Sequence, residues 1–182
     1  MPLLNTITTP YAEAFLQLCD ASGDTESVIL QARQVLETWN GSSELREAMA
    51  SPVLEPDAKK AALEKIFASE ISPNFLNLLK LLSDRQRIGF LDAVLERLLE
   101  LHRDQNGIAL ATITTATPLS DDQHAQLVEK VKAVAGTDKV ETVLKVDPNL
   151  IGGFVIRVGS KVIDSSLAGQ VRRLALELAA AS

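Results

Sequence analysis

The chain has 182 residues, of which 46% are hydrophobic and 23% charged, with a formal net charge of −6. This composition is typical of a folded protein of one domain or two small ones, and no apolar run approaches the roughly 20 residues of a membrane helix. The N-terminus has neither the basic and apolar segments of a secretory signal nor the arginines of an organelle transit peptide. Cys19 is the only cysteine, which excludes an internal disulfide and fits a reducing compartment.

The charge is unevenly distributed along the chain. Residues 1–105 hold 10 of the 18 Lys and Arg and 16 of the 24 Asp and Glu, so their net charge is −6, whereas residues 106–182 hold eight of each. Binding to nucleic acid requires clustered cations that replace phosphate counterions. The acidic first part argues against that role and the neutral second part does not require it, so we expect no nucleic-acid partner.

Residues 1–105 have helical periodicity throughout. Proline at a first helical position costs nothing because its missing N–H would have no partner there, and this predicts helix starts at Pro10 and Pro73. Six helices are expected, beginning at Pro10, after Gly23-Asp24, at Ser43, near Pro56, at Pro73 after the Ser72 cap, and at about Arg87, with Gly107 closing the last one. Short connections between them predict a compact six-helix bundle.

Short alternating strands replace this pattern after residue 106. Ser120 and Gln123 have the spacing of a capping box at the start of a helix, and Gly159-Ser160 fits a two-residue hairpin. The order is strand, helix, three strands and a last helix over residues 166–180. We therefore predict an α+β protein, with an N-terminal six-helix bundle over residues 1–105 and a small α/β C-terminal domain over residues 106–182, whose short sheet carries two helices.

No catalytic, cofactor or metal site is predicted. His102 and His124 have no neighbouring His or Cys to complete a zinc site, and we interpret both as solvated. Cys19 lies on an apolar helix face, where a buried inert thiol is expected rather than a nucleophile. Gly152-Gly153 belongs to no phosphate-binding motif and precedes a strand, so these glycines are interpreted as backbone bends.

The positive signals concern binding surfaces. The fifth helix has more apolar residues than one stripe of about 100° can hold, so it is either central in the bundle, which the pattern favours, or half-covered by a partner. The first helix shows a similar excess, and the two together could flank a groove for an amphipathic helix. The predicted groove residues are Tyr11, Phe15, Leu18, Leu76, Leu79 and Leu82.

The last helix has an apolar stripe that includes Leu167, Val171 and Leu174. We favour the interpretation that this stripe covers the small sheet and leaves Arg172 and Arg173 in solvent. The alternative is that both arginines face an acidic partner helix.

The C-terminal run NLIGGFVIRVGSKVIDSSLAGQVRRL resembles the signature of the ATP synthase delta subunit family, which is related to the mitochondrial oligomycin-sensitivity-conferring protein. The resemblance rests there on Ile151-Gly152-Gly153, on Gly159, and on Asp164 with Ser166. Near the N-terminus it rests on the run YAEAF that begins at Tyr11. It covers essentially the whole chain, although Thr8-Thr9 stands where a basic residue often precedes the first motif, and DRQR from Asp84 replaces the family's N-G-R turn.

This resemblance implies a non-catalytic stator subunit of an F-type ATP synthase. It implies that residues 1–105 bind the N-terminal helix of the alpha subunit between the first and fifth helices, and that residues 106–182 contact the b-type peripheral-stalk subunits. It also implies a peripheral position on the cytoplasmic face of an energy-coupling membrane, a bacterial plasma membrane or a cyanobacterial thylakoid, held there only through the complex. The alternatives are a helical adaptor of another complex and a small enzyme with a site between its domains.

Overall fold

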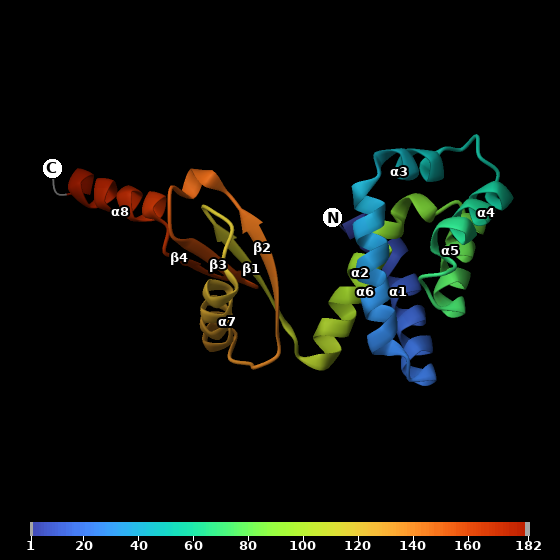
Figure 1. The fold of residues 1–182 in the computed structure, drawn as a ribbon, viewed down its shortest axis with the longest axis horizontal. Coiled ribbons are helices and arrows are strands. Elements are labelled where there is room, and N and C mark those ends of the chain that lie inside the picture. Colours follow the sequence, from blue (N-terminus) through green and yellow to red (C-terminus); the bar gives the residue numbers. More distant parts are fainter. Residues whose placement is uncertain (1, 181–182) are drawn as a thin grey trace. The chain divides into compact units, whose positions relative to one another are not determined.

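The computed structural model describes residues 2–180, and side chains from residue 5 to residue 176. The protein is α+β, with eight α-helices and one four-stranded mixed sheet in the described part of the chain (Figure 1). It divides into two compact units, Met1–His102 and Arg103–Ser182. Each unit has a hydrophobic core of its own.

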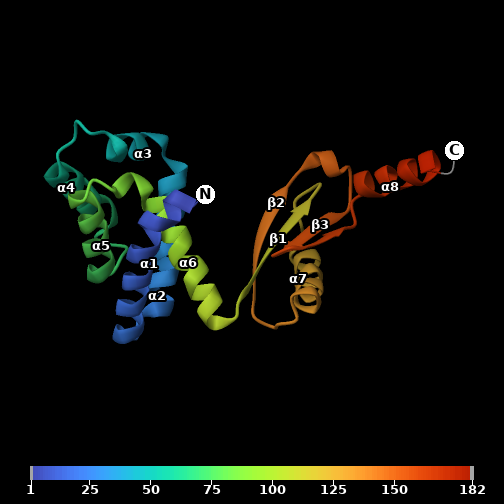
Figure 2. The ribbon, with the colours of Figure 1, turned by 180° about the vertical axis from the view of Figure 1, so that it is seen from behind.

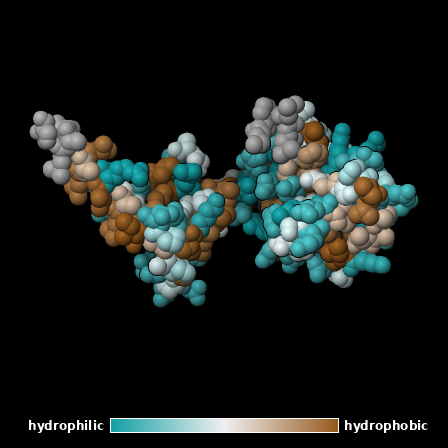
Figure 3. Space-filling view, turned by 90° about the horizontal axis from the view of Figure 1, so that it is seen from above, coloured by the Kyte–Doolittle hydropathy of each residue, from teal (hydrophilic) through white to brown (hydrophobic). Residues whose placement is uncertain are grey.

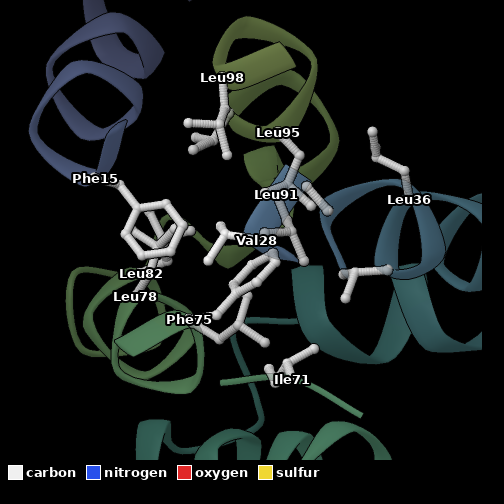
Figure 4. Packing of buried hydrophobic residues seen from close by; sticks show 14 of the residues in the cluster. Phe15, Val28, Leu36, Ile71, Phe75, Leu78, Leu82, Leu91, Leu95 and Leu98 are labelled. Carbon is white, nitrogen blue, oxygen red and sulfur yellow. The ribbon is translucent and has the colours of Figure 1, made fainter. Parts of the chain in front are cut away.

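The first unit is helical. Its elements are α1 (Pro2–Ser22), α2 (Thr25–Gly41), α3 (Ser43–Ala50), α4 (Pro56–Phe67), α5 (Pro73–Asp84), a 3-10 turn η1 (Ile88–Phe90) and α6 (Leu91–Asn106), which runs on into the second unit. All six helices contribute buried residues to one core. Figure 4 shows Phe15 of α1, Val28 of α2 and Leu91 of α6 pointing into this core together with Phe75 of α5.

Local signals set most of these helix ends as predicted. The Ser72 hydroxyl accepts a hydrogen bond from the Phe75 N–H at 3.3 Å, which caps α5 ahead of Pro73. Gly107 follows α6 with φ +65°, a left-handed conformation that glycine adopts without steric cost. The short helix α3 ends before Ser51-Pro52, because the residue before a proline disfavours helical geometry.

The predicted start of the first helix is wrong. The helix α1 begins at Pro2, and Pro10 lies in its interior. An interior proline removes one backbone hydrogen bond and crowds the preceding turn, at a cost of about 3 kcal/mol. Thr8, in the turn before Pro10, is only 1% exposed. We infer that packing of this upstream turn against the unit stabilises the helix across the proline.

The second unit holds the sheet. Its elements are β1 (Ala109–Thr115), α7 (Asp121–Ala135), β2 (Val140–Val146), a 3-10 turn η2 (Pro148–Leu150), β3 (Phe154–Val158), β4 (Lys161–Asp164) and α8 (Leu167–Ala180). The strand order is β2-β1-β3-β4. β1 pairs parallel with β2 and antiparallel with β3, and β3 pairs antiparallel with β4. This order of elements along the chain is the predicted one.

One face of the sheet packs on α7. Ile113 of β1 lies opposite Ile156 of β3, and both are buried with Leu127 and Val131 of α7. The capping box that fixes the start of α7 is formed as predicted: the backbone N–H at position 123 donates to the hydroxyl at position 120, and the side chain at 123 accepts from the backbone N–H at 120. The two ribbon views show α7 against the sheet and α8 extending from the sheet instead of lying across it (Figures 1 and 2).

Candidate partner-binding surfaces

The α1 and α5 helices meet at the predicted groove, and their contact is part of the core. The rings of Phe15 and Phe75 lie 5.4 Å apart between centroids, and Figure 4 shows Phe15 directed toward Leu78 and Leu82 of α5. The six residues named for this groove fall into two groups. Phe15, Leu79 and Leu82 are buried, while Tyr11 and Leu76 are half-buried and Leu18 is 45% exposed.

This burial changes which residues can offer surface to a partner. Leu79 and Leu82 have no exposed area in the free protein, and an aspartate at Phe15 would place a carboxylate in the core, where an unpaired charge is strongly unfavourable. A substitution at Phe15 therefore tests folding as much as binding. The members of the set that reach the surface are Leu18 and the half-buried Tyr11 and Leu76.

Leu81 was not among the predicted residues, although it is 43% exposed beside this contact. It lines a hollow of about 540 Å³ with Tyr11, Arg85 and Arg87. Arg87 donates a hydrogen bond to the Tyr11 hydroxyl at 2.8 Å, and its guanidinium lies 5.6 Å from the centre of the ring. The hollow therefore joins apolar surface from both helices to two cationic side chains.

The helical spacing alone indicates that Leu81 lies outside the buried stripe of α5. The buried apolar residues of α5 lie at positions i, i+3, i+4 and i+7, which form one stripe; they are Phe75, Leu78, Leu79 and Leu82. Leu76 and Leu81 fall outside that stripe. An apolar residue outside the buried stripe is expected nearer the surface, and the two leucines lie on opposite flanks of the stripe. Leu76 still packs against the core, so Leu81 is the leucine of α5 that faces outward.

The last helix does not cover the sheet. Leu167, Val171 and Leu174 of the predicted stripe are 48%, 64% and 59% exposed. The prediction that the stripe packs on its own sheet is therefore wrong. Arg172 and Arg173 are exposed, as expected from either interpretation. Figure 3 shows hydrophobic residues gathered at the surface of the unit that carries α8, on the left of the view.

The first turn of α8 is held firmly even though residues 170–176 are exposed. Ser166 caps it: the Ser166 hydroxyl accepts from the Gly169 N–H at 3.0 Å and donates to the Asp164 carboxylate at 2.6 Å. The Ser166 N–H donates to the same carboxylate at 2.9 Å. These two bonds to Asp164, with smaller contributions from Arg173 and Arg172, lower the pKa of its carboxyl group. Arg173 also donates to the Asp164 carbonyl oxygen at 3.3 Å.

The Gly152-Gly153 step packs against this turn, so the interpretation of these glycines as backbone bends is confirmed. Gly153 has φ +76°, and a Cβ there would overlap the carbonyl oxygen of Ser165. A Cβ on Gly152 would lie 2.9 Å from Leu167 Cδ1, and Leu167 N–H donates to the Gly152 carbonyl at 3.0 Å. The segment around these glycines therefore fixes where α8 starts and how it leaves the sheet.

The two histidines and the cysteine differ in their surroundings. His102 is 4% exposed, so its interpretation as a solvated histidine is wrong; its imidazole lies 3.6 Å from the Glu26 carboxylate. His124 is half-buried, with Nε2 3.1 Å from the Thr142 hydroxyl. Cys19 is buried as predicted, and burial, with two aspartates nearby, raises its pKa to about 11. A thiol held protonated is a poor nucleophile.

Within the described residues, no three His, Cys, Asp or Glu side chains are grouped closely enough to share a metal ion. None of the described helices combines the length and apolar character of a membrane span. Two exposed apolar surfaces are therefore the candidates for binding a partner. The α1–α5 face is defined as Tyr11, Leu18 and Leu81. The α8 face is defined as Leu167, Val171 and Leu174, with Arg172 and Arg173 on its two flanks.

Known proteins resemble this chain over almost its whole length. Residues 7–178 match the family described as ATP synthase delta (OSCP) subunit. The ATP synthase subunit delta of Prochlorococcus marinus strain MIT 9211 is 66% identical over 179 residues, which is 98% of each chain. That of Synechococcus sp. strain CC9605 is 57% identical over 182 residues, covering both chains fully.

Among solved structures, a chain of the Toxoplasma gondii mitochondrial ATP synthase hexamer, determined by cryo-electron microscopy, superposes with a TM-score of 0.71. The match covers 93% of this chain and 95% of that one, at 19% identity. At that identity the likeness shows the fold alone.

Proposed function

Because this chain belongs to the ATP synthase delta (OSCP) subunit family, we propose that it is a non-catalytic stator subunit of an F-type ATP synthase. The six helices of residues 1–105 act as one bundle that holds the N-terminal helix of the alpha subunit. Residues 106–182 hold the b-type subunits of the peripheral stalk. The protein then sits on the cytoplasmic face of the energy-coupling membrane and reaches the membrane only through the complex. The observation that carries this proposal is the family match over residues 7–178.

The α1–α5 face suits an amphipathic helix. Leu18 and Leu81 are nearly half-exposed, and Phe15 and Phe75 pack directly beneath the junction of the two helices. A helix laid along this junction would cover the two leucines with its apolar stripe. Two arginines at the hollow beside Tyr11 favour a partner with an acidic residue at that end.

The α8 face is the docking surface proposed for the stalk. Its apolar side chains are each about half-exposed or more, and an isolated helix with such a face is stabilised when a partner covers it. Arg172 and Arg173 lie on the same turns and favour an acidic partner helix. Firm anchoring of the first turn by Asp164 and Ser166 allows force on α8 to reach the sheet.

A stator must hold while the rotor turns, so slow dissociation matters more than fast association. An interface of standard size buries roughly 800 Å² on each partner and can reach nanomolar affinity. Two separate apolar faces, one on each unit, allow the chain to hold the head and the stalk at the same time.

The head-binding assignment is tested with substitutions that leave the core intact. Leu18→Asp and Leu81→Asp each place a carboxylate on the α1–α5 face, and we expect at least about tenfold weaker binding of an N-terminal peptide from the alpha subunit in calorimetry. Leu30→Asp is the matched control, because Leu30 is 63% exposed on α2 outside this face. Equal affinities for all three variants and the unmodified chain would contradict the assignment of the α1–α5 face as the binding site for the alpha subunit.

The stalk-binding assignment has its own variants. Val171→Asp and Leu174→Asp should weaken binding of a C-terminal fragment from the b-type stalk protein and leave the alpha-peptide affinity unchanged, while Leu18→Asp should do the reverse. If a single substitution weakened the binding of both partners to the same extent, the two faces would not be separate docking sites. The competing function, a helical adaptor of another complex, predicts no measurable affinity for either fragment.

A further inference from the structure

Lys59 is an unusual lysine in the first unit. It lies in the first turns of α4 and is only 6% exposed. Among the described residues its ammonium has neither an ion pair nor a hydrogen bond, although the next residue, Lys60, pairs with Asp57 at 2.9 Å and with Asp84 at 2.8 Å. Those two carboxylates are therefore engaged by Lys60, and Lys59 is left without a counter-charge.

Lys59 lines a cavity of about 260 Å³ between α3, α4 and η1. The walls are mostly apolar and include Met49, Leu54 and Phe90. Leu54 and Phe90 are each 39% exposed, so they form its mouth. Gln86, which adopts φ +55°, is also in the lining. All these residues belong to the first unit, and none lies on the α1–α5 face.

Two features make this cavity electropositive. A lysine ammonium carries three hydrogen-bond donors and no acceptor, and an anion in the cavity would supply the partner that the Lys59 ammonium lacks. The cavity also includes Pro56, the first residue of α4, whose N-cap Glu55 makes no side-chain cap bond. The N-terminal end of a helix carries partial positive charge that favours an anion, and at α4 the N-cap Glu55 and Asp57 in the first turn offset part of that charge. The lining has no carboxylate.

We propose that this cavity binds a carboxylate carried on an apolar body, with Lys59 as its counter-ion. One lysine and no arginine in the lining suit a singly charged carboxylate better than a phosphate, which recruits several cations or an arginine fork. The apolar walls would hold the rest of the ligand. The cavity volume is just below the range of roughly 300–1,000 Å³ for small-ligand pockets, which suits a short acid or one acidic side chain with an apolar neighbour.

The carboxylate could come from a free acid or from a partner's acidic side chain, and two pairs of probes separate these sources. Hexanoate and hexan-1-ol are titrated into the full chain, followed by a capped Leu-Glu-Leu peptide and its Leu-Gln-Leu counterpart. We expect the acid in at least one pair to bind about tenfold or more tightly than its neutral analogue. Binding by hexanoate alone indicates a free acid, and binding by the glutamate peptide indicates a protein segment.

Three variants assign any such binding to this cavity. Lys59→Met keeps the length of the side chain without its charge, and the preference for the acid should disappear. Lys60→Met removes the same charge outside the cavity lining and should keep the preference. Leu54→Asp supplies a carboxylate at the mouth, so it should block the acid while Lys59 remains. The proposal is overturned if neither acid is preferred, or if either Lys59→Met or Leu54→Asp binds the acid as the unmodified chain does.

Discussion

Gly153→Ala should unfold the second unit or strongly lower its stability, whereas Gly159→Ala should have a much smaller effect. Both glycines have positive φ, +76° and +56°, so an L-residue at either costs about 1–2 kcal/mol in backbone strain. They differ in surroundings. A Cβ on Gly153 would overlap the Ser165 carbonyl oxygen and lie 3.1 Å from its carbon, whereas a Cβ on Gly159 meets nothing within 4 Å.

The expected difference in stability between the two variants follows from that overlap. The neighbour is backbone that also donates from Ser165 N–H to the Phe154 carbonyl at 2.9 Å, so it cannot move without loosening the β3–β4 end of the sheet. Overpacking of this kind costs about 1–3 kcal/mol beyond the strain. For a unit of this size each kcal/mol lowers the melting temperature by about 4–8 °C, so the two variants should differ by roughly 4–24 °C.

The assay uses the single tryptophan as an internal reference. Trp39 is buried in the first unit, so its fluorescence follows unfolding of that unit, while far-ultraviolet circular dichroism follows both. Gly153→Ala should lower the melting temperature of the second unit, which is seen by circular dichroism, and leave the transition reported by Trp39 unchanged. Equal melting curves for the Gly153 and Gly159 variants would refute the reasoning, because the two differ in steric surroundings and share the positive φ.

Three single residues give further tests. The pKa of the Asp164 carboxyl group is lowered in the folded state, so its stabilising effect is present above its unfolded pKa, near pH 4, and is lost as the pH falls through the folded value. Asp164→Asn should therefore reduce the fall in the melting temperature of the second unit as the pH is lowered. Cys19, buried and with a pKa raised to about 11, should not react with a thiol-specific disulfide reagent at pH 8 until denaturant is added, and prompt reaction in the native state would contradict its placement. Lys59→Met should raise the free energy of unfolding by about 1 kcal/mol in urea titration, because the largely buried side chain keeps its length and loses an unpaired charge; Lys60→Met should not raise it.

Local chemistry explains what the sequence predicts well. The Ser72 cap, the Ser120 capping box, and the hairpin at Gly159 depend on residues within a few positions of one another. They therefore appear in the structure where the spacing places them.

Features that depend on distant packing were predicted less well. Pro10 satisfies the rule for a helix start, but the buried Thr8 upstream shows that tertiary packing continues the helix through it. The bend near Gly152 involves positive φ at Ile151 as well, +65° for a β-branched residue, which no propensity favours. An apolar stripe on α8 indicates a face that requires cover, but the stripe alone does not say what covers it.

The same reason explains the groove residues. An excess of leucines on α5 indicates that some of them face outward, yet Leu79 and Leu82 are buried while Leu81 is exposed. Which leucine is inside depends on how α1 and α5 meet through Phe15 and Phe75. That contact joins residues 60 positions apart, so it is not visible in the spacing within either helix.

The proposed function requires one chain to hold the head and the stalk at once through separate faces. The most direct measurement is to immobilise the C-terminal fragment of the b-type stalk protein, load the full chain, and record by surface plasmon resonance whether the N-terminal alpha peptide then binds. We predict a ternary complex that Leu18→Asp destroys at the peptide step and Val171→Asp destroys at the loading step. Peptide binding that displaces the chain from the fragment, or no capture of the chain at all, would contradict the account.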